Sequence, residues 1–278
     1  MCIRDRSGGG VVLGQGGYRV ESRFRPDTEQ NPGPGRMPAV SRTEWSDMKV
    51  SLLVTVYNVR DSLPVTLASI EAQDYEDMEA VIVDGGSTDG TVELIRQFAA
   101  KMADRQGLCV RWVSEPDEGL YDAMNKAFRM STGDVVAVCN DILCKPNAVS
   151  SLVDALRSGG PHCIGAHSDL VYVEGEKIVR QWRMGQGRIS QGWMPGHPTL
   201  FLRRQVYEKY GFYDTSYRCA ADYEFMVRFL KDERNILAYV PEVLVAMFYG
   251  GTSNAGLGNY LVSFKEGYQA LKKNGVPR

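Results

Sequence analysis

Polar and acidic side chains recur in this sequence at the points where apolar runs end. They are Thr55, Tyr57, Asp84, Asp89, Glu115, Asp117, Asn140 and Asp141. Several carboxylates in one place would repel a bare anionic ligand, whereas a hard divalent cation prefers oxygen ligands and can carry phosphate groups. These residue types therefore predict a site for a divalent cation and a phosphate-bearing ligand.

Alternating strands and helices from residue 49 onward are expected to bring these side chains together. Apolar runs typical of buried parallel strands lie within 49–58, 79–91, 108–117 and 133–141. They alternate with predicted helices at 61–73, 91–102, 118–133 and 146–159. Such repeats favour an α/β fold with an open, mostly parallel sheet flanked by helices. Ligands bind such sheets where the strands end, at their carboxyl edge.

The second half of the chain is less regular and is expected to form a smaller, irregular region. The pattern predicts a hairpin at 169–183, a short strand and a helix at 196–211, a helix at 220–232, two short strands split by Pro241 within 235–251, and a closing helix at 259–273. We therefore divide the domain 48–278 into the halves 48–145 and 146–278.

Composition limits the class of protein. The chain has 278 residues, 24% of them charged, with a net charge of −2, so no strong electrostatic attraction to nucleic acid is expected. The sequence contains no run of about 18 apolar residues of the kind that crosses a membrane as a helix. The six cysteines form no C-x-x-C pair, which favours reduced thiols in a cytoplasmic protein.

The first 47 residues differ from the rest of the chain. They contain "SGGG", "GQGG" and "NPGPGRMP", and such Gly/Pro-rich sequence buries little apolar surface. We predict that segment 1–47 is disordered or non-native.

Four motifs occur in a recognisable order: "VSLLVTVYN", "VIVDGGSTDGT", "SEPDEGLYDAMNKAF" and "AADYEFMVRF". Together they resemble family 2 glycosyltransferases of the GT-A fold over about residues 49–250. The likeness is greatest to bacterial enzymes of surface-polysaccharide assembly, of the colanic acid and O-antigen type. It implies a nucleotide-sugar donor, a divalent metal (Mn²⁺ or Mg²⁺), and inversion at the anomeric carbon.

The resemblance also implies roles in donor binding for individual residues. Thr55 and Tyr57 match positions that hold the nucleobase, and Asp84 matches a carboxylate that accepts from its imide N–H. Asp117, Asp122 and Lys126 match further polar positions, and His197 matches a histidine near the diphosphate. Asn140 could bind a ribose hydroxyl. From the residues alone, Asp84 could simply open the Gly85-Gly86 turn, Asp89 could cap the next helix, and Lys126 could lie on a solvated face.

Two carboxylates are implied to carry the chemistry. Asp141 matches the metal ligand, although the family commonly has two acids where this chain has Asn140-Asp141; a simple Asx turn is the alternative. Asp222 matches the catalytic base, with a helix N-cap as the alternative and Glu224 as the next candidate base. Glu118 stands where the family commonly has a lysine.

The sequence therefore predicts an inverting, hexosyltransferase-type enzyme. It would move a sugar from a nucleotide-sugar donor to a saccharide acceptor, expected to be lipid-linked, in polysaccharide biosynthesis. A nucleotidyltransferase that makes nucleotide sugars is one alternative, but "TVYNVRDSL" lacks the glycine-rich loop expected after the first strand. A non-catalytic partner subunit is the other. Arg203, Arg204, Lys272 and Lys273 could contact a membrane surface, so peripheral association with the inner face of the cell membrane stays open.

Overall fold

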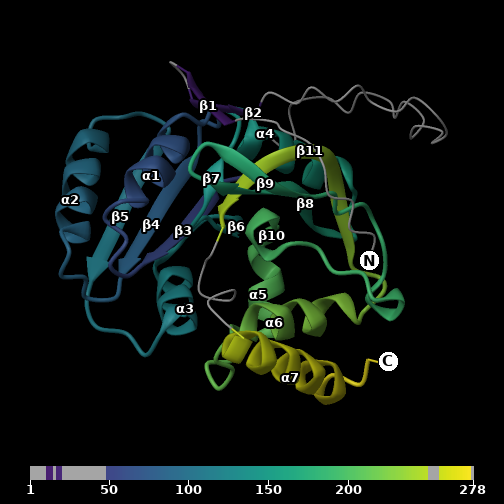
Figure 1. Cartoon of the computed structure of the whole chain (residues 1–278). Helices are drawn as coiled ribbons and strands as arrows, with labels where there is room; N and C mark the ends of the chain where they lie inside the picture. The colour runs from purple at the N-terminus through teal and green to yellow at the C-terminus, as the bar shows by residue number, and fades with distance from the viewer. Residues whose placement is uncertain (1–10, 15–16, 21–47, 250–256, 277–278) are drawn as a thin grey trace.

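The computed structural model describes residues 11–14, 17–20, 48–249 and 257–276 (Figure 1). Most of segment 1–47, predicted to be disordered or non-native, lies outside these residues. Within it, strands β1 (Val11–Gly14) and β2 (Gly17–Val20) pair antiparallel in a sheet of their own.

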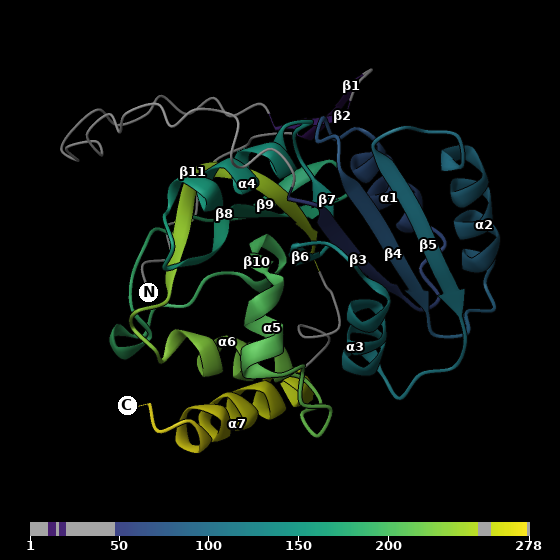
Figure 2. The same cartoon turned by 180° about the vertical axis from the view of Figure 1, so that it is seen from behind.

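A single curled sheet forms the centre of the molecule (Figures 1 and 2). Its parallel part consists, in spatial order, of β5 (Leu108–Ser114), β4 (Met78–Asp84), β3 (Val50–Val56) and β6 (Val135–Val138). The short antiparallel β10 (Phe201–Arg203) then joins β6 to β8 (Cys163–Glu174), which runs parallel to β11 (Ile236–Phe248). The sheet is completed by β7 (Ile142–Leu143), antiparallel to β11, and by β9 (Lys177–Trp182), which forms the predicted hairpin with β8.

Helices cover both faces of this sheet. One apolar core lies beneath α1 (Leu63–Glu71), α2 (Thr91–Met102) and α4 (Ala148–Ser158). The other lies beneath α3 (Leu120–Met130), α5 (Arg204–Tyr210) and α6 (Ala221–Leu230), with α7 (Leu257–Lys273) outside α6 (Figure 2). In β3, Leu52 contributes to the first core and Leu53 to the second, and both are fully buried. Burial on both faces explains why this strand is continuously apolar.

The prediction of two short strands split by Pro241 is wrong. Residues 236–248 form one strand whose register against β8 shifts between Val240 and Val243. The irregularity accommodates Pro241, because a proline has no backbone N–H to donate to a neighbouring strand. The strand therefore continues to Phe248, whose backbone hydrogen-bonds to Asp141.

Among the residues that the structure describes, no helix combines the length and the apolar character that a bilayer crossing requires.

Buried His167 on β8 generates a prediction about stability. Its ring lies between Trp193 and Tyr239, with centroid distances of 5.4 and 5.1 Å, and no hydrogen bond to either ring nitrogen exists within the described residues. Burial lowers the pKa of His167 from 6.5 to about 4. The unfolded chain therefore binds a proton more readily, so the contribution of His167 to stability is complete above pH 6.5 and is lost as the pH falls toward 4.

We expect His167→Leu to remove this loss. The free energy of unfolding of the variant, relative to that of the wild type, should then rise by roughly 1 kcal/mol for each pH unit below 6.5. Denaturant unfolding at pH 7, 6 and 5 measures it. The same substitution at the exposed His162 is the control and should leave the slope unchanged. Parallel stability curves for wild type and His167→Leu would contradict the prediction.

Candidate active site

Asn140 joins the ends of two neighbouring parallel strands. Its Oδ1 accepts from the backbone N–H of Thr55 at 2.7 Å, and its Nδ2 donates to Thr55 Oγ1 at 2.9 Å. The backbone pairing of β3 with β6 ends just before this point, where Cys139 N–H donates to Leu53 O at 2.7 Å. The side-chain amide of Asn140 therefore extends the pairing of β3 with β6 by one residue and fixes the position of the adjacent Asp141.

Asp141 is a partly buried carboxylate in apolar surroundings. Burial chiefly raises the pKa of Cys139 and of Tyr172, and the charge of the nearby Asp141 adds to both increases. A backbone hydrogen bond from Phe248 reaches Asp141. Burial raises the pKa of Asp141 itself to about 7, against the smaller opposing effect of that hydrogen bond. No lysine or arginine forms an ion pair with it within the part of the chain that the structure describes.

This environment suits a bound cation. An ionised carboxylate without a counter-charge is costly in such a setting, and a hard divalent ion would remove that cost while accepting its oxygen as a ligand. The described residues contain no cluster of three His, Cys, Asp or Glu side chains placed to hold a metal. Asp141 would thus be the protein's carboxylate ligand, with the remaining oxygens supplied by a ligand's phosphates and water.

Asp84 is fully buried at the end of β4 and accepts hydrogen bonds from the turn that follows it and from the neighbouring strand β5. Its Oδ2 accepts from Gly86 N, Ser87 N and Ser114 Oγ at 3.0, 2.9 and 2.7 Å, and Ser87 Oγ donates to its Oδ1. The structure thus shows the turn-forming role that was the alternative for this residue. Contact with a nucleobase stays a prediction.

Asp89 lies one residue before Gly90, the N-cap of α2, and its Oδ1 accepts from the N–H of Thr91 at 3.0 Å. Its Oδ2 accepts from Arg60 N at 3.0 Å. Asp89 therefore holds the start of this helix, but the N-cap is Gly90 and not, as predicted, Asp89.

Tyr57 and Asp117 meet above Gly85. A Cβ atom at position 85 would lie 2.5 Å from Asp117 Oδ2 and 3.4 Å from the ring of Tyr57. Tyr57 is 63% exposed although it is aromatic, which leaves its ring available to a ligand. The turn after β4, the loop after β5 and the end of β3 thus converge on one open surface, as the parallel topology predicts.

Asp122 and Lys126 are paired on the outer side of α3. Lys126 Nζ lies 3.5 Å from Asp122 Oδ2 and 3.2 Å from Glu115 Oε1, and it donates to Pro116 O at 3.0 Å. Desolvation is the largest single effect on the pKa of Lys126 and lowers it, but hydrogen bonds and charge from Glu115 and Asp122 together raise it above its usual value. Asn125 turns inward instead, and its side chain bonds both the N–H and the C=O of Tyr213.

Asp222 lies in the first turn of α6, beside a group of aromatic side chains. Tyr121 OH donates to its Oδ1 at 3.1 Å, and Oδ2 has no hydrogen bond among the described residues. The N-cap of α6 is Ala220, so Asp222 is not the capping residue. His197 Nε2 bonds Tyr213 OH at 2.8 Å. Burial lowers the pKa of His197, while the negative charge of Asp222 acts in the opposite direction.

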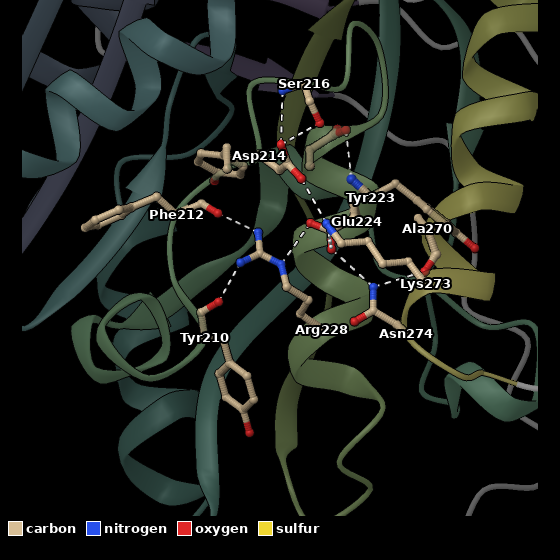
Figure 3. Close-up of polar contacts among 12 residues, drawn as sticks. Tyr210, Phe212, Asp214, Ser216, Tyr223, Glu224, Arg228, Ala270, Lys273 and Asn274 are labelled. Carbon is tan, nitrogen blue, oxygen red and sulfur yellow. Dashed lines mark hydrogen bonds and ion pairs between the residues drawn. The ribbon is translucent and has the colours of Figure 1, made fainter.

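Glu224, the second acid of α6, is fully buried in a structural network (Figure 3). Its Oε2 lies 2.8 Å from Arg228 Nε, and its Oε1 accepts from Asn274 Nδ2 at 3.1 Å and lies 3.7 Å from Lys273 Nζ. The network ties α6 to α7. Glu224 is therefore unavailable as an alternative base, whereas Asp222 has an open oxygen.

Glu266 on α7 holds the segment that leads into α6, a role that the sequence analysis missed. Its two oxygens accept from the backbone N–H groups of Arg218, Cys219 and Ala220 at 2.9, 2.8 and 3.0 Å. A negative charge is favourable at a helix N-terminus. Because Ala220 lies two residues before Asp222, Glu266 positions the start of the helix that carries the candidate base. Nothing in the sequence spacing indicates this contact.

Comparison with known proteins agrees with this geometry. Residues 51–221 match the family described as "Glycosyl transferase family 2", so the chain belongs to the family 2 glycosyltransferases. A PGL/p-HBAD biosynthesis glycosyltransferase of Mycobacterium bovis is 31% identical over 214 residues, covering 73% of this chain and 78% of the relative.

Solved structures show the same fold. The Staphylococcus aureus TarS fragment 1–349 in complex with UDP-GlcNAc has a TM-score of 0.63 at 18% identity, covering 82% of this chain and 66% of that one. Glucosyl-3-phosphoglycerate synthase from Mycobacterium tuberculosis, in complex with Mn²⁺, UDP and glucosyl-3-phosphoglycerate, has a TM-score of 0.57 at 17% identity and covers 87% of each chain.

The predictions of family, of enzyme class and of an α/β, GT-A fold are therefore confirmed. Because the chain belongs to the family 2 glycosyltransferases, the alternative that it is a nucleotidyltransferase is excluded. The predicted roles of individual site residues stay predictions.

The contacts of Glu266 generate a prediction. In Glu266→Gln the side chain keeps one acceptor oxygen, but its NH₂ group replaces the other. That group cannot accept from the backbone N–H groups that now bond to Glu266. We expect a loss of about 1–3 kcal/mol of unfolding free energy, measured by denaturant unfolding. Gln269→Ala, at an exposed position of the same helix, is the control and should change little. Equal stability of Glu266→Gln and wild type would contradict this role.

Proposed function

We propose that this protein is an inverting glycosyltransferase that moves a hexosyl group from a nucleotide-sugar donor to a saccharide acceptor. The acceptor is lipid-linked, and the product enters a surface polysaccharide or glycolipid. The main support for this proposal is that Asp222 has an open carboxylate oxygen next to Tyr121. Glu224, its neighbour on α6, is by contrast fully buried and ion-paired.

Asp222 acts as the general base in this scheme. An inverting transfer needs one carboxylate to take the proton from the attacking acceptor hydroxyl. The hydrogen bond from Tyr121 orients Oδ1 and leaves Oδ2 to receive the proton. Glu266 supports this role by holding the backbone just before α6, and the Glu224 network supports it by tying α6 to α7.

The donor lies across the carboxyl ends of β3, β4 and β6. Tyr57 and Asp117 border the nucleoside, with Asp84 buried behind them, and Asn140 and Thr55 lie toward the diphosphate. Asp141 would hold Mn²⁺ or Mg²⁺, which when bound would neutralise the charge of the leaving diphosphate. His197, Asp122 and Lys126 complete the surroundings. Solved neighbours in complex with Mn²⁺ and UDP or GDP-Man support this assignment.

We also propose a cytoplasmic location. The cysteines that the structure describes, Cys109, Cys139, Cys144, Cys163 and Cys219, are all free thiols. Free thiols persist in a reducing compartment.

Asp222→Asn tests the function. The substitution keeps the size of the side chain and removes its basicity, so we expect transfer to fall roughly 10²-fold or more, with donor affinity nearly unchanged. Single-turnover transfer assays and calorimetric donor titrations measure the two quantities.

The exposed Asp154→Asn, on α4, is the matched control for this experiment. Turnover of Asp222→Asn near the wild-type rate would contradict the assignment of the base. Wild-type protein that binds donor without transferring or hydrolysing it would favour the non-catalytic partner subunit instead.

A further inference from the structure

The outer face of α7 exposes large apolar side chains in a regular stripe. Leu261, Phe264 and Tyr268 are 62%, 73% and 41% exposed. Their spacing of three and four residues places them on one side of the helix. Single exposed apolar residues are ordinary, but a contiguous row on one helix indicates a surface that meets an apolar environment.

The same face is positively charged. Lys265 and Lys272 are exposed and fall within the stripe by helical spacing. Neither forms an ion pair with any residue that the structure describes, whereas Lys273, next in the sequence to Lys272, pairs with Asp214 at 2.9 Å. Glu266, the acid of this segment, turns inward to the backbone before α6.

The opposite face of α7 is fixed to the protein. Ala270 is fully buried, Gly267 lies against the ring of Tyr223, and Asn274 donates to Glu224 (Figure 3). In both overall views α7 is the outermost helix on its side of the molecule (Figures 1 and 2). The stripe is therefore presented outward by a helix whose orientation is set.

The basic residues first considered for membrane contact lie elsewhere. Arg203 Nε donates to Cys163 O at 2.9 Å, and Arg204 bonds Gly133 O and Ser131 Oγ. Both guanidinium groups are occupied within the fold, so the surface is defined by α7 and not by these arginines.

Size and charge decide what covers the stripe. Three side chains of this kind present roughly a few hundred Å², well below the roughly 800 Å² per partner of a standard protein interface. Aromatic and aliphatic residues bordered by lysines suit the boundary between the headgroups and the acyl chains of an anionic bilayer. We propose that α7 docks the protein on an anionic membrane surface through Leu261, Phe264, Tyr268, Lys265 and Lys272.

The docking adds a membrane contact to the proposed glycosyltransferase function. Its role in catalysis rests on that proposed function. Glu266 connects α7 to the backbone two residues before Asp222. A docked α7 therefore holds the base helix at a fixed orientation to the bilayer, where the saccharide of a lipid-linked acceptor is presented.

Vesicle co-sedimentation of the full chain tests the docking. We expect binding to phosphatidylcholine vesicles that contain phosphatidylglycerol, and weak binding to phosphatidylcholine alone. The double variant Leu261→Ser/Phe264→Ser should lower the partition coefficient at least roughly tenfold. Lys265→Gln/Lys272→Gln should lower it by roughly 30-fold on anionic vesicles only. The control Ile236→Ser changes a residue that is 48% exposed on β11 and should have no effect.

Two results would overturn the docking: no binding by the wild type, or binding that the α7 variants leave unchanged. A dimer in sedimentation velocity that Leu261→Ser/Phe264→Ser abolishes would assign the face to a second copy instead. Hydrolysis of the donor without vesicles separates the two proposals, because the α7 variants should retain it. Vesicle binding without any hydrolysis or transfer would leave the docking intact and refute the enzymatic function.

Discussion

The carboxylate of Asp141 is the constraint on which the site depends. It lies among Cys139, Tyr172 and the end of β11, and burial raises its pKa to about 7. A folded-state pKa above the unfolded value means that its contribution to stability is present below pH 4 and is lost as the pH rises through 7. Around neutral pH the folded protein would therefore gain from a cation that balanced this charge. The amide of Asn140 adds no second charge beside it and holds the strand end in place.

The candidate donor-binding residues and the candidate base come from different parts of the chain. The parallel strands β3, β4 and β6 bring the candidate donor-binding residues to one edge. Some of their contacts are local to the turns, and others, such as Asn140 with Thr55, join neighbouring strands. Asp222 lies on α6. Tyr121 of α3 donates to its carboxylate, and Glu266 of α7 accepts from the backbone just before this helix. The candidate base is thus positioned by helices that lie far apart in the sequence.

The regular part of this architecture could be predicted from the sequence, because apolar periodicity reports burial directly. Helix α2 begins and ends where its pattern predicts, and the motif order places Asp84, Asp141 and Asp222 at strand and helix ends. Pro241 misled the prediction, since a register shift absorbs it within β11. Pairings such as Asn140 with Thr55, or Glu266 with the start of α6, depend on tertiary neighbours 85 and 46 or more residues away, which no local pattern reports.

The most direct test of this account is a calorimetric titration of Mn²⁺ into the protein with uridine or guanosine diphosphate present. The wild type should bind the nucleotide in a metal-dependent way, and Asp141→Ala should lower that affinity at least roughly 100-fold while remaining folded. Asp154→Ala, at an exposed acid on α4, should bind as the wild type does. Metal-dependent binding that survives in Asp141→Ala would contradict the account and move the cation to other acids at the edge of the sheet.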